Sequence, residues 1–370
     1  MMSKVLKSPS KYVQGPGVLG EFDQYLRGMG RRLLVIISRS GVRRVCPTLE
    51  ACFAGKDYQL HYEIFSGECS QSQIDRLTAA AAEQQATAVV GIGGGKILDT
   101  AKAVAHETGL PVVIVPTVAS TDSPCSSLSV IYRDSGEFER YLFLDACPDM
   151  VLVDTAVIAK APVSLLVAGM GDAMATWFEA RACRASGSNN QTGGKPTRAA
   201  TGLAAMCWEY LRRDGLRAKQ AVEAGACTEA VETIVEVNTY LSSVGFESGG
   251  LAAAHAIQKG FTFIPELHDL YHGCKVAFCT LAQLVMEDAP RTEVEEVLDF
   301  CCQVGLPVCF ADMGWPDIDH GLLCLAAEKT CVPGATLHHM PFPVTPDMVH
   351  NALLAADAMG RAWHRREERK

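Results

Sequence analysis

The sequence lacks the features that would place it in a membrane, on the secretory route or on nucleic acid. None of its apolar runs approaches the roughly 20 residues needed to span a bilayer. Its N-terminal stretch, MMSKVLKSPSKYVQG, has no hydrophobic segment of the kind found in signal peptides. With a net charge of −9, it also has no basic stripe that could neutralise phosphates. We therefore expect a cytoplasmic protein with no membrane partner and no nucleic-acid partner.

Regular cysteine spacing is missing too, although the chain contains 15 cysteines. A disulfide scaffold would need a smaller chain and evenly placed pairs, whereas Cys301 and Cys302 are adjacent and most others stand in apolar helical runs. Reduced, buried thiols are the better interpretation. With 370 residues, of which 48% are hydrophobic and 20% charged, the chain is long enough for about two domains with large cores.

Short β-branched runs alternate with helical patterns in the first half of the chain. Buried strands are expected at residues 33–37, 62–65, 88–92, 112–115 and 150–153. Amphipathic helices are clearest at residues 72–85 and 98–108, and residues 133–144 have the pattern of a hairpin. Strands separated by helices of this length predict an α/β domain with a parallel sheet and helices on both faces.

The second half changes character after Pro162. Strand patterns nearly vanish, and Ala, Leu, Glu and Met recur at helical spacing to the end of the chain. A polar loop is expected at residues 186–197, and the last helix is expected to begin near residues 343–347. We therefore predict an α/β domain over residues 1–162, which binds a dinucleotide, and an all-α domain over residues 163–370, which binds metal and substrate.

A glycine-rich loop, GIGGGK, occupies residues 91–96 between a predicted strand and a predicted helix. Glycines at such a turn let the backbone approach phosphate oxygens, and the helix N-terminus favours the negative charge. The spacing is not G-x-G-x-x-G, because Lys96 stands at the third glycine, and Val90 replaces the first glycine of a P-loop. A tight structural turn is the alternative. Asp99, early in the following helix, is expected to be a cap or a first-turn charge.

One aspartate and two histidines, far apart in the chain, stand in Gly- or Ala-rich helical stretches. They are Asp172 in MGDAMATWFEA, His255 in GGLAAAHAIQKG and His272 in HDLYHGCKVAF. Zn²⁺ accepts carboxylate oxygen and imidazole nitrogen, and three protein ligands leave one position for water or substrate. The trio therefore indicates a catalytic metal site. The alternative, three separately buried polar groups, would leave costly unpaired charges.

The glycine loop, the stretch PTVASTDSPCS and the trio together resemble glycerol-oxidising members of the metal-dependent, so-called iron-containing, alcohol dehydrogenase family. The similarity runs nearly end to end, through SPSKYVQG, GIGGGKILDTAKA, TVASTDSPCSSLSVIY, GDAMATWFEARAC, NTYLSSVGFESGGLAAAHA, HGCKVAF and HHMP. It implies a Rossmann-like domain, a helical domain and an active site in the cleft between them. It also implies zinc-dependent oxidation of glycerol, or a close vicinal diol, to dihydroxyacetone or the matching hydroxyketone. NAD would accept the hydride, and family members commonly form octamers.

The resemblance assigns roles to individual residues. Asp172, His255 and His272 match the zinc ligands, where the substrate would also bind. Asp122, in STDSP, matches the residue that contacts glycerol, and we expect it to orient a hydroxyl or help a proton leave. Phe246 is expected to wall the substrate pocket, with simple packing as the alternative. Cofactor contacts would fall on Gly94, Gly95, Lys96, Thr117, Ser120, Ser126, Leu128 and Tyr132.

Candidate additional ligands fit this pattern less well. The family does not use the position of His268, which favours a supporting or surface role. Relatives carry a small residue at Cys279, which favours packing. Thr176 stands where iron-using relatives have a further histidine, and three ligands plus solvent favour zinc over iron.

Two departures from the family pattern concern the cofactor. After the strand at residues 33–37, relatives place glycine and then an aspartate suited to ribose hydroxyls, whereas this chain has Ser38 and Arg39. Losing the carboxylate removes repulsion against a 2′-phosphate, and the arginine could bind one. NADP is therefore a possible cofactor beside NAD, the alternative being weaker NAD binding. Ile97 also replaces a hydroxyl residue that could contact phosphate.

Two other functions remain open. The same architecture serves glycerol-1-phosphate dehydrogenases and dehydroquinate-synthase-like enzymes, which act on phosphorylated substrates and need cationic side chains near the metal. Around the trio only Lys259 and Lys275 carry such charges. A non-catalytic descendant is the third possibility, favoured only by the altered residues at positions 38, 39 and 97. The intact trio and Asp122 favour an NAD(P)-dependent polyol dehydrogenase.

Overall fold

The computed structural model describes residues 3–367 and divides them into two compact units. The α/β unit consists of residues 7–163 and 221–243, and the helical unit consists of residues 3–6, 164–220 and 244–367. The first segment of the α/β unit ends at residue 163, and residues 221–243, which follow the first half of the chain, also belong to it. No helix in the described part of the chain is long and apolar enough to cross a membrane.

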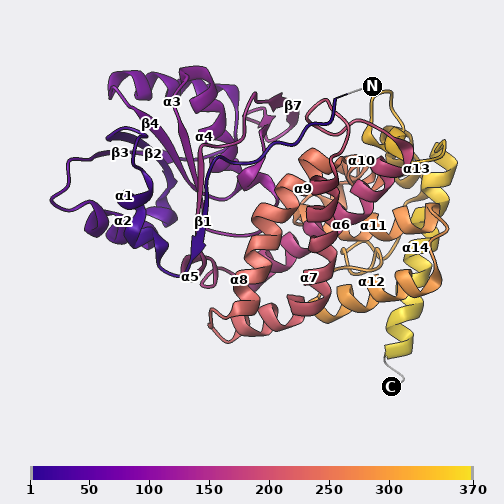
Figure 1. Cartoon of the computed structure of the whole chain (residues 1–370). Coiled ribbons are helices and arrows are strands. Elements are labelled where there is room, and N and C mark those ends of the chain that lie inside the picture. The colour runs from indigo at the N-terminus through magenta and orange to yellow at the C-terminus, as the bar shows by residue number, and fades with distance from the viewer. Residues whose placement is uncertain (1–2, 368–370) are drawn as a thin grey trace. The chain divides into compact units, whose positions relative to one another are not determined.

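A six-stranded parallel sheet, in the order β1-β8-β5-β4-β2-β3, forms the centre of the α/β unit (Figure 1). Its strands are β1 (Tyr12–Gly15), β2 (Arg32–Ser38), β3 (Gln59–Phe65), β4 (Ala88–Gly93), β5 (Val112–Pro116) and β8 (Met150–Asp154). All five predicted strands are present. The sequence analysis missed β1, because this edge strand has four half-buried residues, YVQG, with little apolar pattern.

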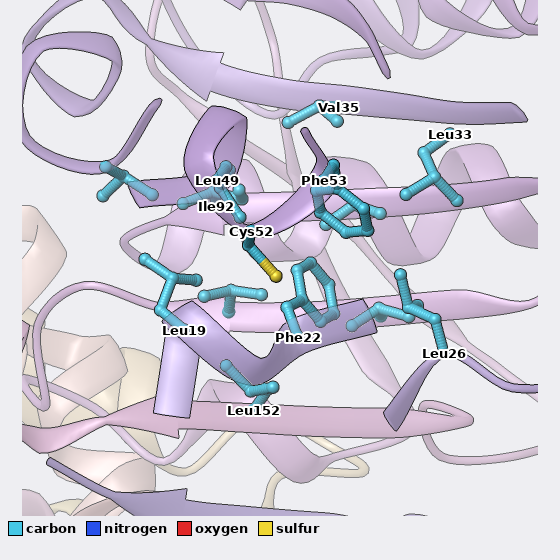
Figure 2. Close-up of a cluster of buried hydrophobic side chains, with 14 of the residues drawn as sticks. Leu19, Phe22, Leu26, Leu33, Val35, Leu49, Cys52, Phe53, Ile92 and Leu152 are labelled. Atoms are coloured by element: carbon cyan, nitrogen blue, oxygen red, sulfur yellow. The ribbon is translucent and has the colours of Figure 1, made fainter. Parts of the chain in front are cut away.

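Helices cover both faces of this sheet, as predicted. One face packs on η1 (Val18–Glu21), α1 (Phe22–Tyr25) and α2 (Arg39–Phe53). Figure 2 shows the resulting cluster, in which Phe22 and Phe53 lie beside Leu33 and Val35 of β2 and Leu152 of β8. The opposite face packs on α4 (Gly95–Thr108), which in turn contacts α3 (Gln71–Glu83). The alternating apolar residues of the strands therefore serve two separate cores.

The predicted hairpin is also present, as a two-stranded antiparallel sheet of β6 (Leu128–Tyr132) and β7 (Phe138–Phe143). It follows η2 (Ser123–Cys125), and α5 (Thr155–Ile158) follows β8. Two later elements complete the unit, α8 (Glu229–Glu236) and the π-helical turn η3 (Val237–Leu241). They bind the edge strand β1, since Gln14 Nε2 donates to Glu232 Oε2 at 2.9 Å and the Tyr12 and Thr239 hydroxyls lie 2.8 Å apart.

The helical unit contains no strand of the described sheets and is built from helices of 8 to 26 residues. They are α6 (Val163–Ser186), α7 (Arg198–Glu223), α9 (Ser242–Gly249), α10 (Ala253–Gly260), α11 (His272–Met286), α12 (Arg291–Val304), α13 (His320–Thr330) and α14 (Pro346–Glu367), with short turns η4 (Phe261–Phe263), η5 (Pro265–Leu267) and η6 (Thr336–His339). Helix α6 is buried along most of its length, because it is rich in Ala and Gly and is not amphipathic. The fold class predicted from the sequence is thereby confirmed.

Candidate active site

The three predicted metal ligands come together in the helical unit, from three different helices. Asp172 lies in the middle of α6, His255 in the first turn of α10, and His272 is the first residue of α11. The Nε2 atoms of both histidines lie 3.3 Å from Asp172 Oδ1, and the three ligand atoms are all within 4.8 Å of one another. Asp172 and His255 are buried, while 38% of the His272 side chain is exposed. One side of the cluster is therefore open.

Close backbone contact between two helices brings Asp172 and His272 together. Gly171, next to Asp172, lies against the backbone carbonyl of Gly273, next to His272, and a Cβ added at either glycine would overlap the other helix. Only glycine allows two backbones to approach this closely. The glycine neighbours of the two ligands thus set the distance between them.

Glu179 fixes the position and the tautomer of His255. It is fully buried on α6, two turns after Asp172, and its Oε1 accepts from the backbone N–H groups of Ala252 and His255 at 2.8 and 3.0 Å. Its Oε2 lies 2.5 Å from His255 Nδ1. An ionised carboxylate can only accept, so Nδ1 carries a proton, and Nε2, on the side of Asp172, is the nitrogen that can bind a metal ion once it is deprotonated. This is the arrangement that a metal-ligating histidine needs.

Gln283 provides the second cap of the helix that carries His255. The residue at the cap position, Ala252, has no side-chain acceptor, and Gln283 Oε1 of α11 accepts instead from the N–H groups of Ala253 and Ala254, at 3.2 and 3.0 Å. The otherwise unpaired donors at the start of α10 are thus satisfied from a neighbouring helix.

The electrostatics of the cluster favour a bound cation. Burial alone would raise the pKa of Asp172, but His272 and His255 lower that pKa to below its usual range. Burial alone would lower the pKa of His255, but Glu179 and Asp172 hold it well above its usual value. Two buried carboxylates require positive charge beside them, from protons on the histidines or from a metal ion that replaces those protons. The donor set of one oxygen and two nitrogens fits a divalent metal.

Thr176 stands at the position considered for a fourth protein ligand, four residues after Asp172. It is buried on α6, one helical turn after Asp172. Its methyl group faces Gly245 of α9, where an added Cβ would lie 2.6 Å from it. His268 and Cys279 are not among the clustered ligands. His268 is exposed with Nε2 at 2.9 Å from the Thr262 carbonyl, and Cys279 is fully buried on α11.

The glycine loop in the α/β unit contains glycines of two kinds. Gly91 and Gly93 are needed for packing, because an added Cβ would lie 2.5 Å from Ala101 Cβ and 2.6 Å from Ile97 Cδ1. Gly94 and Gly95 have room, with the nearest atoms to an added Cβ at 3.5 and 3.9 Å. Gly94 is the N-cap residue of α4 and has no side chain to cap the helix. The loop thus presents an uncapped helix N-terminus with space beside it, which suits a phosphate.

The predicted cofactor residues lie at the carboxyl ends of three neighbouring parallel strands. Gly94, Gly95 and Lys96 follow β4, Thr117 follows β5 and donates its N–H to Gly93 O at 2.9 Å, and Ser38 ends β2. The strand order reverses between β2 and β4, where nucleotides bind in open α/β sheets. The other predicted contacts, Ser120, Ser126, Leu128 and Tyr132, lie on the segment after β5 or on β6.

The surroundings of Lys96, Tyr132, Arg39 and Ser38 differ in burial and charge. Lys96 Nζ forms an ion pair with Glu68 Oε1 at 2.5 Å, with 56% of the lysine side chain exposed. Burial raises the pKa of Tyr132 to about 12, so its hydroxyl stays protonated near neutral pH. Arg39 is exposed at the first position of α2, and Ser38 caps this helix by accepting from the Gly41 N–H at 3.0 Å.

Asp122 lies in the α/β unit, just before η2, on a segment held by the π-helical turn. Asn238 Nδ2 donates to the Ala119 carbonyl at 2.9 Å. The Ser242 hydroxyl lies 3.4 Å from Asp122 Oδ2, and the Ser243 hydroxyl donates to the Asp122 carbonyl. Wide helical turns of this type are frequent at functional sites. Phe246, by contrast, lies in α9 of the helical unit and is 5% exposed.

Sequence reasoning missed Glu179, Gln283, Asn238 and Ser243, and it assigned Asp99 wrongly. Asp99 was expected to cap α4 or to supply a first-turn charge, but α4 has neither, and Asp99 Oδ1 accepts from the Ser123 hydroxyl at 2.8 Å. Glu179 did leave a signal, because it follows Asp172 by seven residues and so lies on the same helix face.

Comparison with known proteins supports this reading of the fold and identifies the family. Residues 9–155 match the sequence profile of iron-containing alcohol dehydrogenases. The chain is 51% identical to glycerol dehydrogenase from Citrobacter freundii over 98% of its length and 99% of the relative. It is 44% identical to glycolaldehyde reductase from Halobacterium salinarum over 97% of its length and 99% of the relative. The crystal structure of glycerol dehydrogenase from Schizosaccharomyces pombe is similar with a TM-score of 0.95 and 34% identity, covering 100% of this chain and 94% of that one.

Identities of this size over the full length are shared only within a family, and they confirm the resemblance inferred from the motifs. The chain belongs to the metal-dependent, iron-containing alcohol dehydrogenase family and is an oxidoreductase.

Proposed function

We propose that this protein oxidises glycerol, or a close vicinal diol, to dihydroxyacetone or the matching hydroxyketone, with zinc as the metal and a nicotinamide nucleotide as hydride acceptor. The observation that carries the proposal is the convergence of Asp172, His255 and His272 within 4.8 Å on the partly open side of a buried cluster. The name of the relative at 51% identity, glycerol dehydrogenase, supports the substrate class.

Alcohol oxidation removes a hydride from carbon and a proton from oxygen. A bound divalent cation lowers the pKa of the alcohol, and a bound nicotinamide accepts the hydride. The chain itself would hold the metal through Asp172, His255 and His272, with Glu179 orienting His255. Thr176 supplies no imidazole or carboxylate, so the site has three ligands of the kind that zinc enzymes use, which favours zinc over iron.

Asp122 is proposed to bind a substrate hydroxyl, orienting it or helping its proton to leave. Its segment is held by Asn238 of the π-helical turn, by Ser243 at the start of α9 and by Asp99 of α4. Because this segment is already ordered, orienting the Asp122 carboxylate toward a substrate hydroxyl costs little further conformational entropy. Phe246 is proposed to form an apolar wall of the substrate pocket, with its burial in α9 as support.

The cofactor is proposed to be NAD, with NADP also accepted. Its phosphates would lie at Gly94, Gly95 and Lys96, and the segment from Thr117 to Tyr132 would supply the other contacts. No carboxylate ends β2, where it would repel a 2′-phosphate, and Arg39 is exposed beside that position. The first turn of α2 is therefore proposed to accept NADP, whose 2′-phosphate an acidic residue would repel, as well as NAD.

Two other activities are tested by the same assay. The relative named glycolaldehyde reductase, at 44% identity, favours a second candidate, reduction of a small hydroxyaldehyde at the same metal. A phosphorylated substrate is disfavoured, because Lys275, near His272, is buried and donates to the Leu267 carbonyl at 3.1 Å. A non-catalytic descendant would bind zinc and nucleotide without turnover.

The decisive experiment compares metal-stripped protein with and without added Zn²⁺ or Fe²⁺. Initial rates are measured with glycerol, 1,2-propanediol and glycerol 1-phosphate, using NAD and NADP in parallel, and with glycolaldehyde and NADH in the reverse direction. Activity on glycerol that zinc restores in the wild type, but not in Asp172→Asn, supports the proposal. Activity restored by iron alone rejects zinc, and activity only on the phosphate ester rejects the substrate.

A homo-oligomer, octameric as in many family members, is proposed as the functional form. Light scattering coupled to size-exclusion chromatography measures the subunit number directly. A monomer at micromolar concentration would contradict this part of the proposal.

A further inference from the structure

Lys102 is a fully buried cation that the proposed chemistry does not use. It lies on α4, seven residues after the uncapped start of that helix, and none of its side chain is exposed. A buried ammonium ion is costly unless its three N–H groups all have acceptors. Lys102 has three close ones: Leu128 O at 2.5 Å, Ser123 O at 3.0 Å and Asp99 Oδ1 at 3.0 Å.

The carbonyl acceptors belong to one segment, which runs from η2 into β6. The Ser126 carbonyl and hydroxyl add two longer contacts to Lys102, both at 3.4 Å. Lys102 therefore binds this segment at three successive points, Ser123, Ser126 and Leu128. Ser126 and Leu128 are also two of the proposed cofactor contacts.

Asp99 holds the same segment through different groups. Its Oδ1 accepts from the Ser123 hydroxyl at 2.8 Å, and its Oδ2 accepts from the Val130 N–H at 3.0 Å. Its backbone carbonyl accepts from the Ser129 hydroxyl at 2.9 Å. The Asp99–Lys102 ion pair thus has no net charge and places donors and acceptors along residues 123–130.

One helix consequently connects two parts of the proposed nucleotide site. The start of α4 presents Gly94 and Gly95, and the second and third turns hold residues 123–130 through Asp99 and Lys102. Because a helix is rigid over this length, the phosphate-binding end and the segment keep a constant separation. A buried ion pair is more valuable for such specific placement than for net stability.

We propose that Lys102, together with Asp99, is a positioning residue that holds residues 123–130 in the geometry that binds the nicotinamide nucleotide. It touches neither substrate nor cofactor. The inference rests on the proposed function for the identity of the ligand, and on the buried contacts for the role of the lysine.

The test uses full-length, zinc-loaded protein and the variant Lys102→Met, which keeps the length of the side chain and removes the charge. Binding of NADH and NADPH is titrated by fluorescence, and hydrogen exchange is followed by mass spectrometry. We expect faster exchange at residues 117–132 and nucleotide dissociation constants raised by about tenfold or more, since several hydrogen bonds to a charged group are lost. Zinc content, which depends on the helical unit, stays that of the wild type.

A merely structural role makes a different prediction. Val104→Ala is the matched control, because Val104 is buried on the same helix and its truncation lowers the melting temperature through a cavity. Val104→Ala should leave the nucleotide dissociation constant and the exchange at 117–132 unchanged. If Lys102→Met lowers the melting temperature but binds NADH like the wild type, the positioning role is overturned.

Two further variants cover the case in which Lys102→Met does not fold. The double variant Asp99→Asn/Lys102→Met removes both buried charges, and it should fold yet still bind NADH weakly. Ser123→Ala removes one hydrogen bond to Asp99. It should raise the NADH dissociation constant a few-fold and make hydrogen exchange faster near residue 123. Wild-type affinity in both variants overturns the proposal. A wild-type protein that binds neither NADH nor NADPH instead rejects the proposed function.

Discussion

Gly171 of α6 and Gly273 of α11 lie backbone against backbone, and each is the immediate neighbour of a predicted metal ligand. An added Cβ on Gly273 would overlap the Ala168 carbonyl, and one on Gly171 would overlap the Gly273 carbonyl. Because both obstacles are backbone atoms of long helices, no side-chain rotation can relieve the clash. The distance between Asp172 and His272 therefore depends on the absence of two methyl groups.

Gly273→Ala is expected to separate these helices and weaken the site. Overpacking of this kind costs about 1–3 kcal/mol of unfolding free energy, and zinc affinity should fall with it. The matched control is Gly202→Ala on α7, where an added Cβ meets nothing within 4 Å. This control should gain about 0.5–1 kcal/mol from helix propensity. Chemical denaturation measures the free energy of unfolding, and competition with a chelator measures the zinc affinity. The same stability and zinc affinity in the two variants would contradict the packing argument.

Glu179→Gln is expected to lower zinc affinity about 10–100-fold, the usual effect of losing a partner behind a ligating histidine. The amide keeps the size of the side chain but no longer stabilises the Nδ1–H tautomer as a carboxylate does. Glu293→Gln, which alters an acid paired with Arg181 at 2.6 Å, is the control and should keep wild-type affinity. Zinc dissociation constants from chelator competition decide the matter, and an unchanged value in Glu179→Gln would show that His255 needs no partner.

Ser38→Asp is expected to shift cofactor preference toward NAD, because the new carboxylate repels a 2′-phosphate and accepts from the ribose hydroxyls. Aspartate also caps helices well, so the contact to the Gly41 N–H should survive. Ser38→Asn is the neutral control with the same capping ability. Arg39→Ala should lower kcat/KM for NADP about tenfold, with little change for NAD. If neither Ser38→Asp nor Arg39→Ala changes the ratio of kcat/KM for NADP to that for NAD, the residues at this end of β2 do not contact the 2′ position of the cofactor.

Asp312 gives an expectation for acid stability. Burial raises its pKa, but His364 and the Val308 N–H lower it, and the net pKa lies below the usual value. A carboxyl whose pKa is lower in the folded state stabilises the protein above its unfolded pKa of about 3.9, and this contribution is lost as the pH falls through the lower, folded value.

Asp312→Asn should therefore be less stable than the wild type near neutral pH and should lose less stability on acidification from about pH 5 to about pH 2. The exposed Asp317, changed to Asn, is a nearby control. Urea denaturation across this pH range gives the free energy of unfolding of each variant as a function of pH, and the slopes of these curves are compared. A slope in Asp312→Asn as steep as that of the wild type would show that Asp312 contributes nothing to acid sensitivity.

The sequence by itself determined most of the fold class. Runs such as 33–37 and 150–153 are short, apolar and rich in β-branched residues, and their alternation with helical patterns is typical of a buried parallel sheet. The metal trio was also visible, since large polar groups within Gly- and Ala-rich helices require a common partner. Each of these features is a short stretch of sequence, so both can be recognised without knowing which segments meet in the fold.

Only the tertiary structure decided which distant segments meet. The sequence places Glu179 on the helix face of Asp172, but only the structure shows that Glu179 and Gln283 accept hydrogen bonds from the uncapped start of α10. In the sequence, Lys102 resembles a surface lysine of an amphipathic helix. In the structure it is buried, because residues 123–130 cover it.

The assignment of residues 221–243 to the α/β unit likewise depends on hydrogen bonds between Gln14 and Glu232, more than 200 positions apart in the chain. Such pairings carry no periodicity of their own. They follow from the packing of whole elements, which fixes where each buried donor finds its acceptor.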